Sequence, residues 1–297
     1  MHAVLLYGSE GAGKETLAMA LAQAWLCTSP TEAGACGACA SCEAFLRDRS
    51  ADLLKVVPRG PSEWIRQEAI TPTRGDSEEE LIPLTEFFRT PPLRSANKVA
   101  LILRADRLYP SASNAFLKTL EEPHPYGKIV MTTAEIGLVL PTIVSRCVAV
   151  ACELPLAHEL RALQQDASAD MLSLAEGAPG RLAHVLNHGE VYGRISEFAR
   201  RLVSAPPMQA LALSEEFRAI CDGLQDALGC NARAANVEGL RALGSALSDL
   251  TDREDWLRLL AEAHRRILGN GNDGAVLDAM FAGMLTVASN VASPSRR

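Results

Sequence analysis

The segment Gly8–Thr16, GSEGAGKET, constrains the fold more than any other part of the sequence. It follows the apolar run Ala3–Gly8, which is typical of a buried parallel strand, and it precedes apolar residues at helical spacing up to about Leu26. A glycine-rich loop between a strand and a helix is the setting of a phosphate-binding P-loop. The segment therefore predicts an α/β fold with a P-loop-like connection.

The loop differs from a working P-loop at one position that the chemistry needs. Gly8, Gly13 and Lys14 match the pattern G-x-x-x-x-G-K-[ST], but Glu15 replaces the hydroxyl residue that binds Mg²⁺. Thr16 lies one residue further along the helix, about 100° around its axis, and is a poor substitute. Two interpretations stay open: a structural turn without a ligand, and a degenerate nucleotide site with weak affinity for ATP or ADP.

A second element that ATP hydrolysis requires is altered at the end of the strand predicted within Asn97–Asp106. Such hydrolysis needs an acidic Mg²⁺ ligand at the strand terminus and, in many families, a second acid beside it. Leu103 and Arg104 stand at these places, and Asp106 comes two residues too late. We therefore expect no ATP hydrolysis by this chain itself.

Four cysteines close to the loop have the spacing of a metal site, C-x8-C-x2-C-x2-C. Thiolates two residues apart can bind one tetrahedral Zn²⁺, and a set of four leaves no open position for a substrate. We predict a structural Zn²⁺ site with the ligands Cys27, Cys36, Cys39 and Cys42. Independent free thiols are the alternative, and the four other cysteines are interpreted as small core residues.

Strand and helix signals alternate up to about residue 153, and strand signals then stop. Strands that alternate with helices imply a parallel sheet with helices on both faces. The further strands are predicted at Asp52–Val57, Lys128–Ala134 and Val148–Cys152, and the further helices at about Glu63–Ile70 and at Ser111–Glu122, the latter with Ser111 as its N-cap. We expect an α/β domain over 1–153 with the cysteine module inserted at 27–42, a small helical domain over 154–190, and an all-α domain over 191–297.

The charge of the chain limits its partners. The net charge is −7, so no global positive field attracts nucleic acid. The sequence lacks an apolar run long enough for a membrane span and a basic start typical of a signal peptide. We expect a cytoplasmic protein without a membrane partner.

Several segments in this order resemble the bacterial clamp-loader subunits of the AAA+ family. Besides the cysteine cluster, they are NAFLKTLEEP (Asn114–Pro123), TTA (Thr132–Ala134) and TIVSRC (Thr142–Cys147). The resemblance covers about residues 1–153, and the remainder matches only in broad plan. It implies a AAA+ P-loop NTPase-type fold, followed by a helical lid domain and a helical collar domain for oligomerisation.

Within this family, the residues at the altered sites favour a noncatalytic subunit over the ATP-hydrolysing gamma/tau type. These residues are Glu15, Leu103 and Arg104. The start at Met1 leaves little chain for an adenine pocket, which also points away from tight nucleotide binding.

The resemblance implies a role for Arg146, which on sequence alone has the character of an ordinary surface or salt-bridge residue. In clamp loaders this arginine acts in trans as an arginine finger, at ATP bound by a neighbouring subunit. Thr132 and Thr133 match the sensor position of active relatives. Arg181 matches a lid sensor only loosely, and we assign it no role.

The resemblance also implies the partners. They are gamma/tau and delta subunits in a hetero-oligomer, and, through the assembled complex, the beta sliding clamp and primed DNA at the replisome. Two alternatives remain. One is a catalytically active gamma-like ATPase that tolerates Glu15, and the other is a zinc-bearing DNA-binding protein, which the acidic net charge disfavours.

Overall fold

The computed structural model describes residues 2–60, 63–72, 82–163, 167–268 and 271–292. The chain divides into two compact units, 1–154 and 155–297. The first unit is α/β and the second is entirely helical over its described residues.

The first unit contains a five-stranded parallel sheet. Its strands are β1 (Ala3–Tyr7), β2 (Leu53–Val56), β3 (Lys98–Ile102), β4 (Gly127–Thr133) and β5 (Val148–Ala151). They lie in the order β2-β3-β4-β1-β5, so β1 has β4 on one side and β5 on the other. This order places the predicted glycine loop, which follows β1, near the middle of the carboxyl edge of the sheet.

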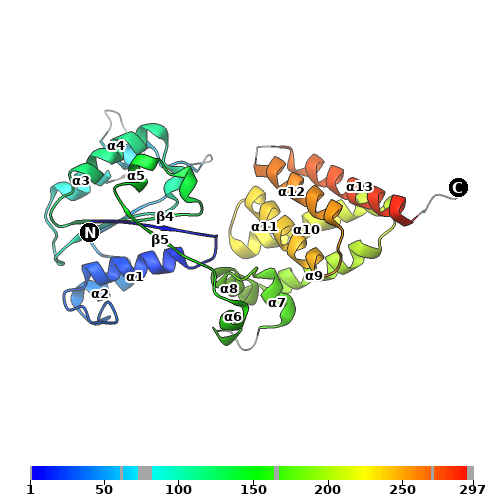
Figure 1. Cartoon of the computed structure of the whole chain (residues 1–297), viewed down its shortest axis with the longest axis horizontal. Coiled ribbons are helices and arrows are strands. Elements are labelled where there is room, and N and C mark those ends of the chain that lie inside the picture. Colours follow the sequence, from blue (N-terminus) through cyan, green and yellow to red (C-terminus); the bar gives the residue numbers. More distant parts are fainter. Residues whose placement is uncertain (1, 61–62, 73–81, 164–166, 269–270, 293–297) are drawn as a thin grey trace. The chain divides into compact units, whose positions relative to one another are not determined.

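Helices cover both faces of this sheet (Figure 1). They are α1 (Lys14–Leu26), α2 (Ala40–Leu46), α3 (Leu84–Arg89), α4 (Pro110–Glu121) and α5 (Pro141–Val144), with short 3-10 turns at Gln67–Ala69, Ala105–Arg107 and Ile136–Leu138. Successive strand residues point to opposite faces. Ala3 and Leu5 therefore enter the core that α3 and α4 cover, whereas Val4 and Leu6 enter the core formed with α1 and α2.

Two local predictions were wrong. The segment predicted as a helix at Glu63–Ile70 forms only a 3-10 turn at Gln67–Ala69, while Ile65 forms a bridge with Leu108. The long helix α4 begins at Pro110, and Tyr109 rather than Ser111 is its N-cap. Proline fits the first helical position because its missing N–H would have no partner there, and its ring presets φ.

The second unit contains α6 (Ala157–Leu163), α7 (Ala169–Leu174), α8 (Pro179–Asn187), α9 (Gly189–Ser204), α10 (Ala210–Leu228), α11 (Ala232–Ser248), α12 (Glu254–Leu268) and α13 (Asp273–Ala292). Phe198, Phe217 and Phe281 meet with ring centroids 5.5–5.7 Å apart, and Trp256 is fully buried in the same core. Large aromatic rings from four helices thus hold the five longest helices together.

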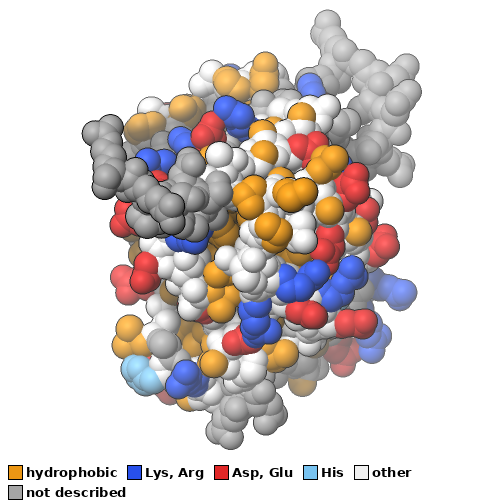
Figure 2. Space-filling view, turned by 90° about the vertical axis from the view of Figure 1, so that its right-hand side faces the viewer, with side chains coloured by type: hydrophobic (Ala, Val, Ile, Leu, Met, Phe, Trp, Pro, Cys, Tyr) orange, Lys and Arg blue, Asp and Glu red, His pale blue; other side chains and the backbone are white. Residues whose placement is uncertain are grey.

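The surface carries exposed apolar side chains among charged ones. Figure 2 shows hydrophobic side chains gathered on one face of the molecule, with basic and acidic side chains interspersed beside them. In the second unit Met208, Leu211 and Leu268 are exposed large hydrophobic residues. Among the described residues, no helix is long and apolar enough to cross a membrane.

Candidate functional site

The glycine loop joins β1 to α1, as the sequence predicts. Gly8, Gly11 and Gly13 have positive φ angles of 145°, 76° and 84°. A Cβ atom at Gly8 would lie 2.3 Å from the carbonyl oxygen of Cys152, which follows β5, whereas a Cβ at Gly13 would meet nothing within 4 Å. Gly8 therefore has a structural task of its own, because it lets the chain after β5 approach the loop.

The lysine of the loop is turned back onto the loop. The Nζ atom of Lys14 donates hydrogen bonds of 2.7 Å to the carbonyl oxygens of both Gly8 and Ser9. The side chain is buried, and this burial lowers the pKa of Lys14, against the opposing effect of Glu10 and other acidic groups. Glu15 and Thr16 are both exposed. The structure thus brings Gly8, Gly13 and Lys14 together, but the ammonium group bonds to carbonyls that belong to its own loop.

At the end of β3, the position of the expected acidic pair is occupied by Leu103 and Arg104. Arg104 has a left-handed backbone with φ of 57°, and its N–H donates to the hydroxyl of Thr132 at 3.1 Å. The hydroxyl of Thr133 donates to Asp106 at 3.1 Å. The two threonines therefore tie β4 to the chain after β3, and Asp106 accepts a bond from Thr133 within this contact.

Arg146 lies in the turn between α5 and β5, and its guanidinium touches two elements. Its Nη1 donates to the carbonyl oxygen of Thr142 at 2.8 Å and to Ser145 Oγ at 3.4 Å. Its Nη2 donates to Glu121 Oε1 at 2.6 Å. The side chain is 35% exposed, so an external acceptor can reach it. Sequence reasoning did not single out Glu121, although an acid at a helix C-terminus is a visible signal because the helix dipole disfavours it there.

The thiol next to Arg146 is not poised as a nucleophile. Burial raises the pKa of Cys147 to about 11, so its thiol stays protonated near neutral pH. Its side chain packs against the core under α4 and α5. Cys147 thus fits a packing role behind the arginine turn.

The four cysteines after α1 come together at one place. All four sulfur atoms lie within 4.8 Å of one another, with Cys27 Sγ 3.5 Å from Cys36 Sγ and 3.9 Å from Cys39 Sγ. A tetrahedral Zn²⁺ with Zn–S bonds of about 2.3 Å needs sulfur atoms about 3.8 Å apart. The donor set Cys27, Cys36, Cys39 and Cys42 therefore fits Zn²⁺ in chemistry and in spacing.

Two of these thiols are electrostatically distinct. Hydrogen bonds from the Thr28 hydroxyl and from the Cys42 N–H lower the pKa of Cys39 to about 5, which favours the thiolate that a metal needs. Burial raises the pKa of Cys42 to about 12. Cys42 would therefore have to lose its proton to the solvent when it binds a cation.

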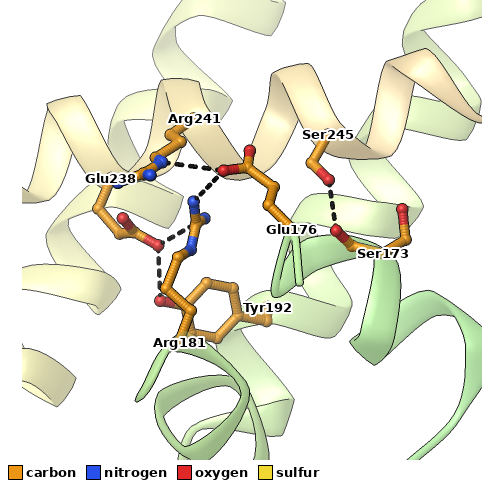
Figure 3. A network of polar contacts seen from close by, with 7 residues as sticks. All are labelled: Ser173, Glu176, Arg181, Tyr192, Glu238, Arg241 and Ser245. Carbon is orange, nitrogen blue, oxygen red and sulfur yellow. Dashed lines mark hydrogen bonds and ion pairs between the residues drawn. The ribbon is translucent and has the colours of Figure 1, made fainter. Parts of the chain in front are cut away.

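Arg181 is committed to a network inside the second unit (Figure 3). Its side chain is only 8% exposed, and it donates to Glu176 at 2.8 Å and to Glu238 at 3.1 Å. Tyr192 donates to the same Glu238 oxygen at 2.9 Å, and Arg241 binds Glu176 at 3.1 Å. Burial raises the pKa of Tyr192, which keeps its hydroxyl a donor. The network joins α8 to α9 and α11.

The structure also contains a cavity that sequence reasoning missed. It has a volume of about 390 Å³ and lies at the open edge of β2, with Trp64, Ile65 and Arg66 among its lining residues. Two strands separate β2 from β1 in the sheet, so the cavity does not belong to the glycine loop.

Similarities to known proteins were found both in sequence and in structure. The family model described as DNA polymerase III, delta subunit, matches residues 1–154. The DNA polymerase III subunit delta-prime of Pseudomonas aeruginosa is 31% identical over 221 residues, which cover 70% of this chain and 64% of that protein. The DNA polymerase III subunit tau of Salmonella typhimurium is 26% identical over 295 residues, which cover 98% of this chain and 40% of that protein. The chain thus spans less than two thirds of the length of these curated relatives.

A solved structure shares the fold. The crystal structure of a DNA polymerase III gamma subunit-related protein from Thermotoga maritima matches with a TM-score of 0.58 and 19% sequence identity. The match covers 96% of this chain and 94% of that one. It supports the fold expected from the sequence: a parallel sheet with helices on both faces, followed by a helical region.

Proposed function

The chain belongs to the DNA polymerase III delta-subunit family of clamp-loader proteins, and on this premise we propose that it is a delta-prime-type subunit of a bacterial clamp loader. It supplies Arg146 to the ATP site of a neighbouring gamma or tau subunit and does not hydrolyse ATP itself. The complex, which also contains a delta subunit, loads the beta sliding clamp onto primed DNA. Under this proposal the protein works in the cytoplasm, at the replisome.

A contrast between two cations carries the proposal. Lys14, which a working P-loop directs at phosphates, is buried and bonded to the carbonyl oxygens of Gly8 and Ser9. Arg146 is partly exposed, in a turn that follows a short helix. The first cation is satisfied within its own loop, and the second is accessible to a phosphate on another protein.

The missing acids support the same assignment. Glu15 stands where a hydroxyl would bind Mg²⁺, and Leu103 and Arg104 stand where an acidic pair would hold the metal and activate water. Thr132 and Thr133, at the predicted sensor position, bond to Arg104 and Asp106 in the chain that follows β3. Nucleotide affinity at the loop, if any, is therefore expected to be weak and without turnover.

An arginine suits the task because of its chemistry. Its guanidinium stays charged at any physiological pH and presents N–H groups in a planar fork that matches phosphate oxygens. Charge that develops on the transferred phosphoryl group is stabilised by such a donor, by about 10³-fold or more in rate. Arg146 thus contributes to catalysis only after a neighbouring subunit brings bound ATP to it.

Contact with the other subunits is proposed to run mainly through the second unit. Its exposed apolar residues Met208, Leu211 and Leu268 offer surface that a partner would cover. The acidic net charge of −7 fits a chain that meets DNA through the assembled complex rather than alone.

Zn²⁺ is proposed to hold the module between α1 and α2. The clustered thiols and the closed set of four ligands support a structural role. Metal analysis of the purified chain should find about one zinc per molecule. Cys39→Ser should lose it, whereas the control Cys230→Ser should keep it. A folded chain without metal would leave the four cysteines as free thiols.

Reconstitution of the clamp loader tests the function. Arg146→Ala is expected to lower ATP hydrolysis by the complex without preventing its assembly. Arg104→Ala is a matched control, because Arg104 is also a half-exposed arginine paired with a carboxylate, Glu63. Equal hydrolysis by the wild-type and Arg146→Ala complexes would return Arg146 to the role of a surface residue.

A gamma-like ATPase is the second candidate, and the match to the Salmonella tau subunit over 98% of this chain is the observation that favours it. Binding of a fluorescent ATP analogue to the isolated chain, followed by turnover, distinguishes the two. Micromolar affinity for the analogue together with hydrolysis would support the gamma-like ATPase and contradict the noncatalytic proposal.

A further inference from the structure

The guanidinium of Arg146 is held from two sides by its own chain. The carbonyl oxygen of Thr142, in α5, accepts from Nη1 at 2.8 Å, and Glu121 at the end of α4 accepts from Nη2 at 2.6 Å. Ser145 Oγ lies 3.4 Å from the same Nη1 and donates to the carbonyl oxygen of Thr142 at 3.1 Å. Helix α4 and the turn after α5 meet at this arginine.

These contacts leave part of the guanidinium unused. An arginine has five N–H donors in one plane. Nη1 makes two contacts and Nη2 makes one. Within the described part of the chain, Nε–H and the second N–H of Nη2 have no hydrogen-bond partner. Because the group is planar, fixing Nη1 and Nη2 also fixes the direction in which the remaining N–H groups point.

Glu121 occupies a position that the helix itself does not favour. The last turn of a helix carries a partial negative charge, so an acidic side chain there is destabilising and a basic one is preferred. Glu121 is the last residue of α4, and its partner Arg146 comes from another element. The stability of α4 alone therefore does not explain why an acid stands at this position.

We propose that Glu121 is a positioning residue for Arg146. The inference rests on the proposed function, in which Arg146 reaches ATP on a neighbouring subunit. The carboxylate holds one edge of the guanidinium and aims the unused N–H groups outward. A finger that is already oriented loses less side-chain entropy when the neighbouring phosphate arrives, and its donors meet the developing charge at the required geometry.

The exposure of the pair fits positioning better than permanent neutralisation. Glu121 is 48% exposed and Arg146 is 35% exposed, so water screens the carboxylate charge. The nearby carboxylate then lowers the attraction of Arg146 for a triphosphate only modestly. A competing role, in which Glu121 withholds Arg146 from the phosphate, predicts the opposite effect on hydrolysis and is an outcome of the test.

The test is ATP hydrolysis by a clamp loader reconstituted with Glu121→Gln. This change keeps the size of the side chain and removes its charge. We expect kcat to fall by roughly tenfold with the KM for ATP unchanged, since loss of orientation affects the transition state more than binding. Glu122→Gln is the matched control: it changes the next carboxylate of the same segment and should leave kcat as in the wild type.

A double variant shows whether Glu121 acts through Arg146. If it does, Glu121→Gln together with Arg146→Ala should be as slow as Arg146→Ala alone. Glu121→Asp keeps the charge on a shorter side chain and should fall between wild type and Glu121→Gln. It also carries the test if the Glu121→Gln complex fails to assemble.

The outcomes separate this inference from the function on which it rests. Unchanged hydrolysis with Arg146→Ala overturns the proposed function. Slow hydrolysis with Arg146→Ala but a wild-type kcat with Glu121→Gln overturns the positioning role alone. Faster hydrolysis with Glu121→Gln also overturns it, because Glu121 would then compete with the phosphate.

Discussion

The glycine loop and the turn of Arg146 lie within one α/β unit, but the cation of the loop is buried and the cation of the turn is partly exposed. In the loop, Lys14 is buried, and two carbonyl oxygens of the loop accept from it at 2.7 Å. In the turn, Arg146 is partly exposed and is held by Thr142 and Glu121. The loop has the backbone of a phosphate site, but its own carbonyl oxygens bond to its lysine. The turn leaves its arginine accessible from outside.

The backbone of such a loop can be required apart from any ligand. Gly8 is needed by the close approach of Cys152, whatever the loop binds. The ammonium group of Lys14 also donates to two carbonyl oxygens of this loop. A glycine-lysine signature is therefore weak support for nucleotide chemistry unless the Mg²⁺ ligands accompany it. An exposed cation such as Arg146 should matter to a partner more than to the stability of its own chain.

The largest effect on stability is expected for a third cation, Arg181. Arg181→Met removes the positive charge between Glu176 and Glu238, and the mostly buried Glu238 then keeps the Tyr192 hydroxyl as its hydrogen-bond donor among the described residues. We expect a loss of about 3 kcal/mol, typical of a broken buried ion pair. Hydrogen exchange followed by mass spectrometry should show faster exchange in α8 and α11. Wild-type protection there would mean that the network does not hold the second unit together.

A smaller loss is expected in the loop itself. Gly8→Ala places a Cβ atom 2.3 Å from the carbonyl oxygen of Cys152 and should destabilise the first unit by roughly 2–3 kcal/mol. Gly13→Ala is the control, because it has open space and should cost only about 1 kcal/mol for its left-handed backbone. Urea unfolding of the isolated chain measures both. Equal losses for the two variants would contradict a structural task that is special to Gly8.

Much of this loop and of its sheet was predictable from the sequence, for a physical reason. Buried parallel strands are continuous apolar runs, so all five strands were found, four of them within one residue of their observed ends. The segment predicted for β3, Asn97–Asp106, runs four residues past the observed end at Ile102. Helix α3 (Leu84–Arg89) was missed because six residues give little periodicity. The segment Glu63–Ile70 was predicted as a helix, but Ile65 instead pairs with Leu108, and only Gln67–Ala69 forms a 3-10 turn.

Most of the contacts that define the sites were not predictable in the same way. The clustering of the four cysteines is the exception, because these residues are close in sequence and their spacing indicates a common site. Glu121 and Arg146 are 25 residues apart, and Arg181 and Glu238 are 57 apart. Their meeting depends on how helices pack. The hydrogen bonds of Lys14 to its own loop depend on its side-chain conformation, which the sequence does not predict.

Lys14 itself is expected to contribute less to stability than Gly8. Lys14→Met loses two hydrogen bonds but also removes a buried charge, so the net change should stay within about 1 kcal/mol. Because burial lowers the pKa of Lys14, the unfolded chain binds more protons between that lowered pKa and 10.5. This residue should therefore make the wild type more stable as the pH rises through that window. Urea titrations at several alkaline pH values should show a smaller rise for Lys14→Met.

The smallest effect on stability is expected for Arg146. A half-exposed ion pair with Glu121 contributes less than about 1 kcal/mol. Arg146→Ala should therefore unfold in urea close to the wild type. A large loss would indicate that Arg146 fastens α4 to α5 and is not kept for a partner.

ATP hydrolysis by the reconstituted clamp loader compares the glycine loop, through Lys14, with the turn of Arg146 in one measurement. Complexes are assembled with wild type, Arg146→Ala or Lys14→Met, and their ATP turnover is compared at equal complex concentration. We predict that Arg146→Ala slows the neighbouring ATP site by about 10³-fold or more, while Lys14→Met stays within about twofold of wild type. Turnover that survives Arg146→Ala but is lost with Lys14→Met would contradict the proposed function, because the chain would then use its own loop rather than supply Arg146 to a neighbouring subunit.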